Sequence, residues 1–185
     1  MSIFKTQWIV IKSKKISEKN NLYTIFTSDY GKILCNKKFS TREKPLDSGY
    51  LINFEIEVKE WINIHKIKNI KILWEFNSFW KDFSLINNFL QLLNIIDKKV
   101  PEKLENREIF QTLENVVRYK DLSTTKIILI QLKIYNILWI LDLEHPNPTI
   151  KKILSFIHKN KSWEILRLSG INEEIERELE KIIKK

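Results

Sequence analysis

WIVIKSKKISEKNNLYTIFTSDYGKILC, residues 8–35, predicts that the fold begins with β-strands. Residues 8–12 form an apolar run rich in β-branched side chains, and residues 22–27 follow with alternating character. A tight turn is predicted at residues 29–32, where Gly31 supplies the positive φ angle that a hairpin turn needs. The turn leads into a further apolar run at residues 33–35. This stretch therefore predicts three consecutive short strands.

Two more strands are expected before residue 76. In residues 52–58, apolar side chains alternate strictly with Asn53, Glu55 and Glu57, which indicates a strand with one buried and one wet face. Residues 70–74 repeat that alternation and predict the last strand. Five short strands at this spacing predict a small closed barrel of the OB type over residues 1–76. Periodicity alone allows an SH3-like barrel as well.

From about residue 78 the apolar period becomes helical. The longest helix, residues 123–143, is apolar nearly all round and should be the centre of a bundle. Asn147 and Pro148 form a typical helix start, and the last helix has acidic residues in its first turn and Lys in its last. The predicted helices cover a stretch from about residue 78 that Pro101 ends, then residues 106–117, 123–143, a stretch from 147, 162–168 and 172–184. The expected fold is α+β, an OB barrel followed by an all-α helical bundle over residues 77–185.

Positive charge is concentrated near the start of the chain. The formal net charge is +9. Residues 1–44 hold ten Lys or Arg against three acids, whereas residues 77–185 hold eighteen against fifteen. The chain is also rich in Ile, Lys and Asn, so part of the Lys excess follows genome composition. A uniform composition bias would not place the imbalance in the first quarter, and we expect this region to face a polyanion.

Other features exclude several protein classes. Cys35 is the only cysteine, so no intramolecular disulfide and no cysteine-based zinc site is expected. The first fifteen residues do not resemble a signal peptide, and the most apolar stretch is too short and polar to cross a bilayer. We expect a cytoplasmic protein with no membrane contact.

Residues 8–32 resemble the opening of bacterial RecO proteins. That opening has an apolar-Val-Leu-Lys strand, a Glu before the second strand, and a Leu-Phe-Thr strand that runs into a Gly-Lys turn. The matching positions are Val10 to Lys12, Glu18, residues 25–27 and Gly31-Lys32. In the helical half, residues 108–110, 132–134 and 150–181 are similar to the family's helices. The four-cysteine zinc module of many RecO proteins is absent, because residues 145–148 read His-Pro-Asn-Pro at that point.

The resemblance implies a recombination mediator without catalytic activity. Such a protein binds single-stranded DNA, anneals complementary strands, and helps to load the recombinase onto DNA coated by single-strand-binding protein. A RecR-like protein and the acidic C-terminal tail of the single-strand-binding protein would be its partners. The expected place of action is the bacterial cytoplasm, at the nucleoid. No cofactor and no metal are implied.

The candidate DNA-binding residues are cations of the first strands and loops with aromatic residues among them. They are Lys12, Lys14, Lys15, Lys32, Lys37, Lys38, Arg42, Lys44, Tyr23, Tyr30 and Phe39. The alternative is that the cations are a solvated surface and the aromatic residues pack in the core. The candidate partner-binding residues, on the helical bundle, are Arg118, Lys126 and Lys133.

Catalysis has little support in the sequence. The three His have no metal-ligand spacing, three Gly are too few for a phosphate-binding loop, and Cys35 lies in a predicted strand where a buried hydrophobic role is expected. The six Trp sit at apolar-periodic positions and should be mostly core, with Trp61 the one expected to be exposed. Two other functions fit the composition: an OB-type RNA-binding protein, and an adaptor whose bundle binds other proteins.

Overall fold

The computed structural model of the chain describes residues 2–18, 20–38, 40, 43–58, 63–75, 83–119 and 122–184. Its contacts divide it into two compact units, a barrel unit (Met1–Phe110) and a helical unit (Gln111–Lys185). Each unit has its own buried apolar core. The functional domain boundary expected after residue 76 stays a prediction.

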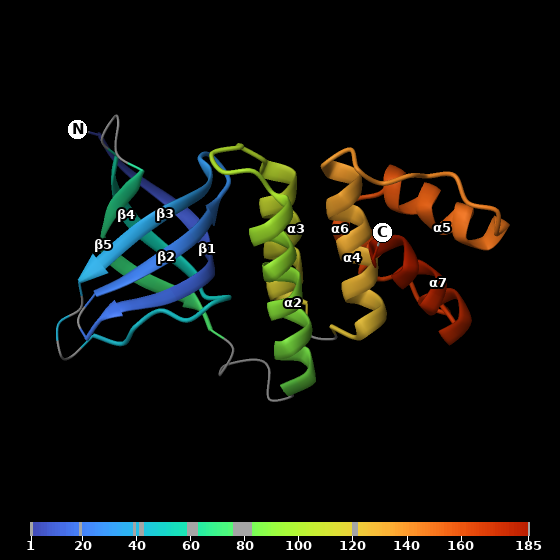
Figure 1. Cartoon of the computed structure of the whole chain (residues 1–185), viewed down its shortest axis with the longest axis horizontal. Coiled ribbons are helices and arrows are strands. Elements are labelled where there is room, and N and C mark those ends of the chain that lie inside the picture. Colours follow the sequence, from blue (N-terminus) through green and yellow to red (C-terminus); the bar gives the residue numbers. More distant parts are fainter. Residues whose placement is uncertain are drawn as a thin grey trace. The chain divides into compact units, whose positions relative to one another are not determined.

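Five strands close into a barrel in the first unit (Figure 1). They are β1 (Ser2–Ser17), β2 (Asn20–Thr27), β3 (Gly31–Lys38), β4 (Leu51–Val58) and β5 (Ile64–Trp74). Their order is β1-β2-β3-β5-β4, and β1 pairs with both β2 and β4. The β3–β5 pair is parallel, whereas the other four pairs are antiparallel. The structure confirms the predicted α+β class with an N-terminal OB barrel.

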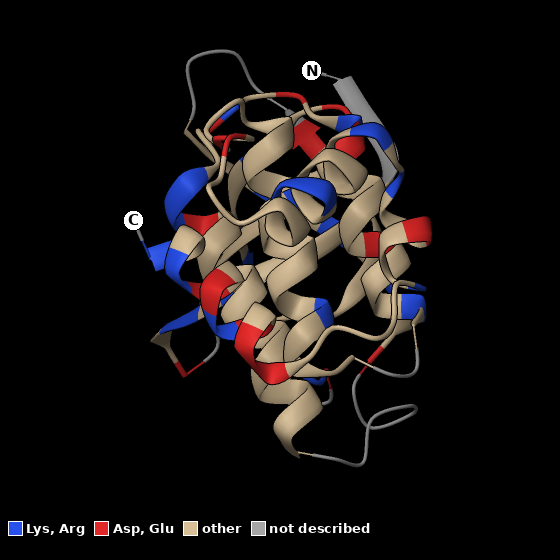
Figure 2. Ribbon diagram, turned by 90° about the vertical axis from the view of Figure 1, so that its right-hand side faces the viewer, with Lys and Arg blue, Asp and Glu red and all other residues tan. Residues whose placement is uncertain are grey.

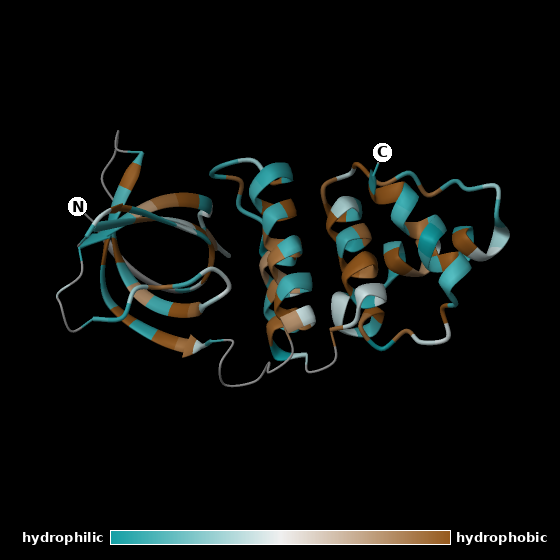
Figure 3. Cartoon of the chain, turned by 60° about the horizontal axis from the view of Figure 1, so that its bottom comes forward, coloured by the Kyte–Doolittle hydropathy of each residue, from teal (hydrophilic) through white to brown (hydrophobic). Residues whose placement is uncertain are grey.

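Alternation along the strands fills the barrel. Ile52, Phe54 and Ile56 of β4 are buried, and the polar residues between them are partly exposed, as the sequence predicts. Trp8 and Phe54 pack with ring centroids 4.3 Å apart. Figure 3 shows the resulting brown and teal bands along the strands. Burial on one side of each strand therefore sets the register of the barrel.

The predicted last strand was too short. β5 begins at Ile64 instead of residue 70. Asn69 has a φ of 51°, and the register with β4 shifts between Asn53 and Glu55. A single left-handed residue bends the strand without ending its pairing, so the apolar period changes phase there. The sequence pattern therefore revealed only the half of β5 that follows the bend.

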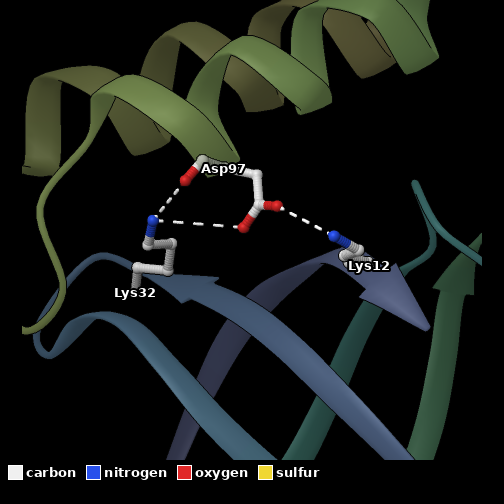
Figure 4. Close-up of polar contacts among 3 residues, drawn as sticks. All are labelled: Lys12, Lys32 and Asp97. Atoms are coloured by element: carbon white, nitrogen blue, oxygen red, sulfur yellow. Dashed lines mark hydrogen bonds and ion pairs between the residues drawn. The ribbon is translucent and has the colours of Figure 1, made fainter. Parts of the chain in front are cut away.

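Helix α2 (Phe83–Lys99) belongs to the barrel unit and contacts β1. Its buried side chains are Phe89, Leu92, Leu93 and Ile96. Ile9, Phe26 and Lys32 are partners across β1, β2 and β3, and all three are buried although they alternate with the residues that fill the barrel. Figure 4 shows α2 lying over these strands. The helix thus supplies a second apolar layer outside the barrel.

In the helical unit, one buried helix contacts three others. The helices that follow α2 are α3 (Arg107–Arg118), α4 (Thr124–Ile137), α5 (Pro148–Lys159), α6 (Ser162–Ile165) and α7 (Glu173–Lys184). Every residue of α4 from Lys126 to Tyr135 is buried, and α4 contacts α5, α6 and α7. This confirms that the apolar helix is central.

Several helix ends follow the sequence signals. Asn106 Oδ1 accepts a hydrogen bond from the backbone N–H of Ile109 at 3.0 Å, and Asn147 Oδ1 accepts one from Thr149 at 2.9 Å. Both are N-cap contacts. The predicted end of α4 was wrong, because the helix stops at Ile137 and Trp139 takes a φ of 59°.

The expectation for the Trp residues holds in part. Trp8 and Trp74 are buried, at 0% and 8% exposed. Trp139 is 89% exposed and Trp163 is 45% exposed, so the core prediction was wrong for both. Trp139 follows the early end of α4, where no helix continues to bury it. Trp61, expected to be exposed, and Trp80 lie outside the described residues.

Candidate nucleic-acid interface

Strand pairing places two lysines in one row across four strands. Lys14 pairs with Leu22, Leu22 with Asn36, and Asn36 with Lys66. Directly paired residues point to the same face of a sheet. The neighbouring residues Tyr23, Cys35 and His65 are buried, so the row with Lys14 and Lys66 points to the outside of the barrel.

Lys12 and Lys38 lie on the same outer side. Lys12 is two residues before Lys14 on β1, and Lys38 is two residues after Asn36 on β3, so strand alternation gives all of them one face. We call Lys12, Lys14, Lys38 and Lys66 the outer strand face. Lys14, Lys38 and Lys66 are exposed, and none of these three forms an ion pair with another described residue. These ammonium groups are spread over β1, β3 and β5.

Lys15 and Lys37 belong to the opposite face. Both pair with Asn21, which is buried and donates a hydrogen bond to the Tyr23 hydroxyl at 3.0 Å. Lys37 Nζ donates to Glu43 Oε1 at 2.9 Å. This hydrogen bond and a second one from the backbone N–H of Ser40 lower the pKa of Glu43. The structure therefore separates these two lysines from the outer strand face.

Lys32 attaches α2 to the barrel (Figure 4). Lys32 is 7% exposed, and its Nζ donates to the backbone carbonyl of Asp97 at 2.5 Å. The Asp97 carboxylate lies 4.0 Å from Lys32 Nζ and 3.4 Å from Lys12 Nζ. The side chain of Lys12 remains 62% exposed. Of these two lysines, Lys12 is therefore the one that a ligand in solution can reach.

Lys44 lies after β3 and is paired. Its Nζ is 3.0 Å from Glu75 Oε2 and 5.5 Å from the centroid of the Tyr50 ring. Hydrogen bonds with Tyr50 and Glu75 raise the pKa of Lys44, and Lys44 in turn lowers the pKa of Glu75. Arg42 lies outside the described residues.

The candidate aromatic residues differ in exposure. Tyr23 is 0% exposed, and its burial raises the pKa of its hydroxyl. Tyr30 is partly exposed, and its ring is stacked 6.2 Å from that of Trp8. Phe39 falls in the part of the chain that is not described. Tyr30 is thus the described candidate with ring surface open to solvent.

Sequence reasoning missed Lys66, because the first half of β5 was not predicted. In the structure His65 and Ile67 are buried, while Ile64, Lys66 and Lys68 are exposed, so the burial of Ile64 and His65 is the reverse of what their polarity predicts. The sequence of residues 64–68 does not alternate between apolar and polar side chains, and it therefore carries no strand signal. The parallel pairing of β5 with β3 joins segments that are far apart along the chain, and the residue pattern does not reveal it.

The three candidate partner-binding residues lie in different surroundings. Lys126 is 9% exposed and its Nζ donates to the backbone carbonyl of Leu168. Lys133 is 4% exposed. Arg118 is exposed and pairs with Glu114 at 2.7 Å. Only Arg118 of this set presents its charge to solvent.

Comparison with known proteins gives one consistent result. No protein-family model matches the chain. It is 28% identical over 113 residues to the DNA repair protein RecO of Caldanaerobacter subterraneus subsp. tengcongensis, a match that covers 60% of this chain and 46% of that protein. It is 25% identical over 114 residues to RecO of Clostridium acetobutylicum, with 60% and 46% covered. It is also 25% identical over 118 residues to RecO of Caldicellulosiruptor bescii, with 62% and 48% covered.

The chain is a distant relative of the RecO proteins. The matched region spans about half the length of the RecO relatives. In the part of the chain that is described, no group of three or more His, Cys, Asp or Glu could hold a metal ion. None of the described helices is long and apolar enough to cross a membrane. Cys35 is buried as expected, and burial raises the pKa of its thiol.

Proposed function

We propose that this RecO relative is a recombination mediator that binds single-stranded DNA on the outer strand face. The observation that carries the proposal is the row from Lys14 to Lys66 across four strands of the barrel. RecO relatives named as DNA repair proteins support it. The protein acts by binding and positioning strands, without catalysis, in the bacterial cytoplasm.

The chemistry of the site suits a phosphate backbone. Ammonium groups on neighbouring strands can each contact one phosphate and release its condensed counterions. Lys12, Lys14, Lys38 and Lys66 are the exposed cations in this role. Lys15, Lys37 and Lys44 would extend the contact, and Arg42, which lies outside the described residues, stays a candidate from the sequence. Tyr30 would stack one base.

The same proposal includes annealing and recombinase loading. A RecR-like protein is the proposed partner in loading. The acidic C-terminal tail of the single-strand-binding protein would bind the helical unit at Arg118, the exposed cation among the three candidates. Lys126 and Lys133, the other two candidates, are buried on α4, so their charges would contribute less to this binding.

A binding titration tests the strand face. Labelled single-stranded DNA, duplex DNA and RNA are titrated at two salt concentrations with the full chain, with the double variant Lys14→Ala/Lys66→Ala, and with the control Lys181→Ala/Lys184→Ala. The control removes two cations that are paired with Glu178 and Glu180 on α7. The strand variant should lose affinity for single-stranded DNA and about 1.4 in the slope of log K against log salt, and the control should not.

Other results would favour other functions. Equal affinity for RNA would favour an RNA-binding protein, and binding without salt dependence would favour an adaptor. A strand-annealing assay with DNA coated by single-strand-binding protein tests the mediator activity directly. A folded protein that fails to anneal such strands would contradict the proposal.

A further inference from the structure

The helical unit carries a basic surface of its own, in addition to the outer strand face of the barrel unit. Residues 148–167 contain five Lys or Arg and one acid. The following helix, α7, contains five Glu and three Lys or Arg. Helices in Figure 2 accordingly carry both blue and red segments. The near-neutral total of the helical half therefore conceals a local excess of positive charge.

Three of these cations belong to α5, and helix periodicity places them on one side of that helix. At 100° per residue, Lys151, Lys152 and Lys159 lie within about one third of the helix circumference. Ile150, Leu154 and Ile157 lie on the other side and are each 0% exposed. The apolar side of α5 packs in the unit, where α5 contacts α4. All three lysines are consequently held facing solvent.

An exposed aromatic residue comes shortly after the lysines of α5 in the chain. Trp163 of α6 is 45% exposed, and the Arg167 guanidinium carbon lies 4.9 Å from the centroid of its ring. Lys161 precedes Trp163 by two residues and is exposed. The one acid of the segment, Glu164, accepts a hydrogen bond from the backbone N–H of Lys161 at 2.9 Å and caps α6. Lys151 pairs with Glu144 at 2.5 Å, but Lys152 and Lys159 have no ion pair with a described residue.

We propose that Lys152, Lys159, Lys161, Trp163 and Arg167, the α5–α6 basic face, form a second binding site for single-stranded DNA. Cations spaced along a helix can follow a phosphate backbone, and an indole packed with a guanidinium offers a flat platform on which any base can stack. An acidic peptide would need an apolar groove for its side chains, and the apolar side of α5 is already covered. The inference rests on the proposed function, because a protein that anneals strands has use for two of them at once.

Photocrosslinking of the full chain locates the site. Short single strands that carry 5-iododeoxyuridine are crosslinked to the protein, and the crosslinked peptides are identified by mass spectrometry. We expect one set of crosslinks in residues 148–167 and a second on β1, β3 or β5. Crosslinks confined to the strands would overturn the second site and leave the proposed function standing. Crosslinks confined to residues 148–167 would support the second site and overturn the proposed binding on the outer strand face.

Variants test the chemistry of the site. In a Lys14→Ala/Lys66→Ala background, Trp163→Ala should lower the remaining affinity for single strands about tenfold, and Trp163→Phe should retain most of it because a phenyl ring still stacks. The matched control is Trp139→Ala, which removes a more exposed Trp from the same unit. Equal losses for Trp139→Ala and Trp163→Ala would contradict the proposal.

A competition experiment separates DNA from an acidic protein segment. An unlabelled single strand should displace the labelled strand from the α5–α6 basic face, and an acidic peptide of matched charge should do so more weakly. If the peptide binds this face and the single strand does not, the surface docks a protein and the proposal fails.

Discussion

Two separate features of the structure require a glycine at position 31. Its φ is 63°, and a Cβ atom added to it would lie 2.1 Å from the backbone oxygen of Leu104. Leu104 belongs to the segment after α2, where the N–H of Lys103 donates to the carbonyl of Lys32 at 3.0 Å. The sequence predicted the first constraint from the turn. The second depends on a distant segment and could not be read from the turn residues.

Gly31→Ala should therefore lower the free energy of unfolding by about 2–5 kcal/mol, because left-handed strain and backbone overlap add together. Gly170→Ala is the matched control: its φ is 79° and nothing lies within 4 Å of the added Cβ. The control should cost about 1–2 kcal/mol. Urea unfolding followed by Trp fluorescence measures both, and equal losses would show that the contact with Leu104 is unimportant.

His65 makes the stability of the barrel depend on pH. The residue is 8% exposed, and its Nδ1 has no hydrogen-bond partner among the described residues. Burial, and secondarily the charge of Lys103, lower its pKa in the folded protein. The unfolded chain binds a proton near pH 6.5, where the folded chain does not. Stability should thus be complete above about pH 7 and fall as the pH drops below about 6.5.

Urea unfolding midpoints at neutral and mildly acidic pH measure this loss. His65→Gln should flatten the dependence over that range, even if it lowers stability at both pH values. His158→Gln, a change at an exposed position, should leave the dependence in place. A wild-type protein whose midpoint rises on acidification would contradict the assignment.

At the scale of elements, the contact between α2 and the barrel relies on a buried lysine. Lys32→Ala would leave the backbone carbonyl of Asp97 without its donor and weaken the attachment of α2. The expected loss in the free energy of unfolding is about 1–3 kcal/mol. Lys38→Ala on the same strand should change it by less than about 0.5 kcal/mol, because Lys38 is exposed. Equal effects would mean that Lys32 behaves as a surface lysine.

The elements also show what the sequence can and cannot predict. Strict alternation predicted β4, and the capping residues Asn106 and Asn147 marked two helix starts, because these signals are local. The bend at Asn69 concealed half of β5, and with it Lys66. Burial of Lys32 and Lys126 depends on carbonyl acceptors at Asp97 and Leu168, which lie 65 and 42 residues away along the chain. The sequence alone does not distinguish a buried lysine from an exposed one, because it does not reveal these distant acceptors.

At the scale of the whole molecule, charge should set how binding responds to salt. If all four cations of the outer strand face contact phosphates, they contribute about −3 to the slope of log K against log salt for a single strand. A protein with alanine at Lys12, Lys14, Lys38 and Lys66 should lose that contribution and keep the part due to the α5–α6 basic face. Titration at four salt concentrations measures both slopes. An unchanged slope would show that DNA does not contact the outer strand face.

The β3–β5 pairing closes the barrel through three residue pairs, from Leu34↔Ile64 to Asn36↔Lys66. The pairing of β2 with β3 has eight. Fewer shared hydrogen bonds mean a smaller free energy of local opening at this seam. Amide hydrogen exchange should accordingly be faster at Ile64 and His65 of β5 than in β2, which pairs with β3 along its whole length. When the seam parts, the closed ring becomes a sheet with two free edges, the form in which such a chain can recruit a strand from another molecule.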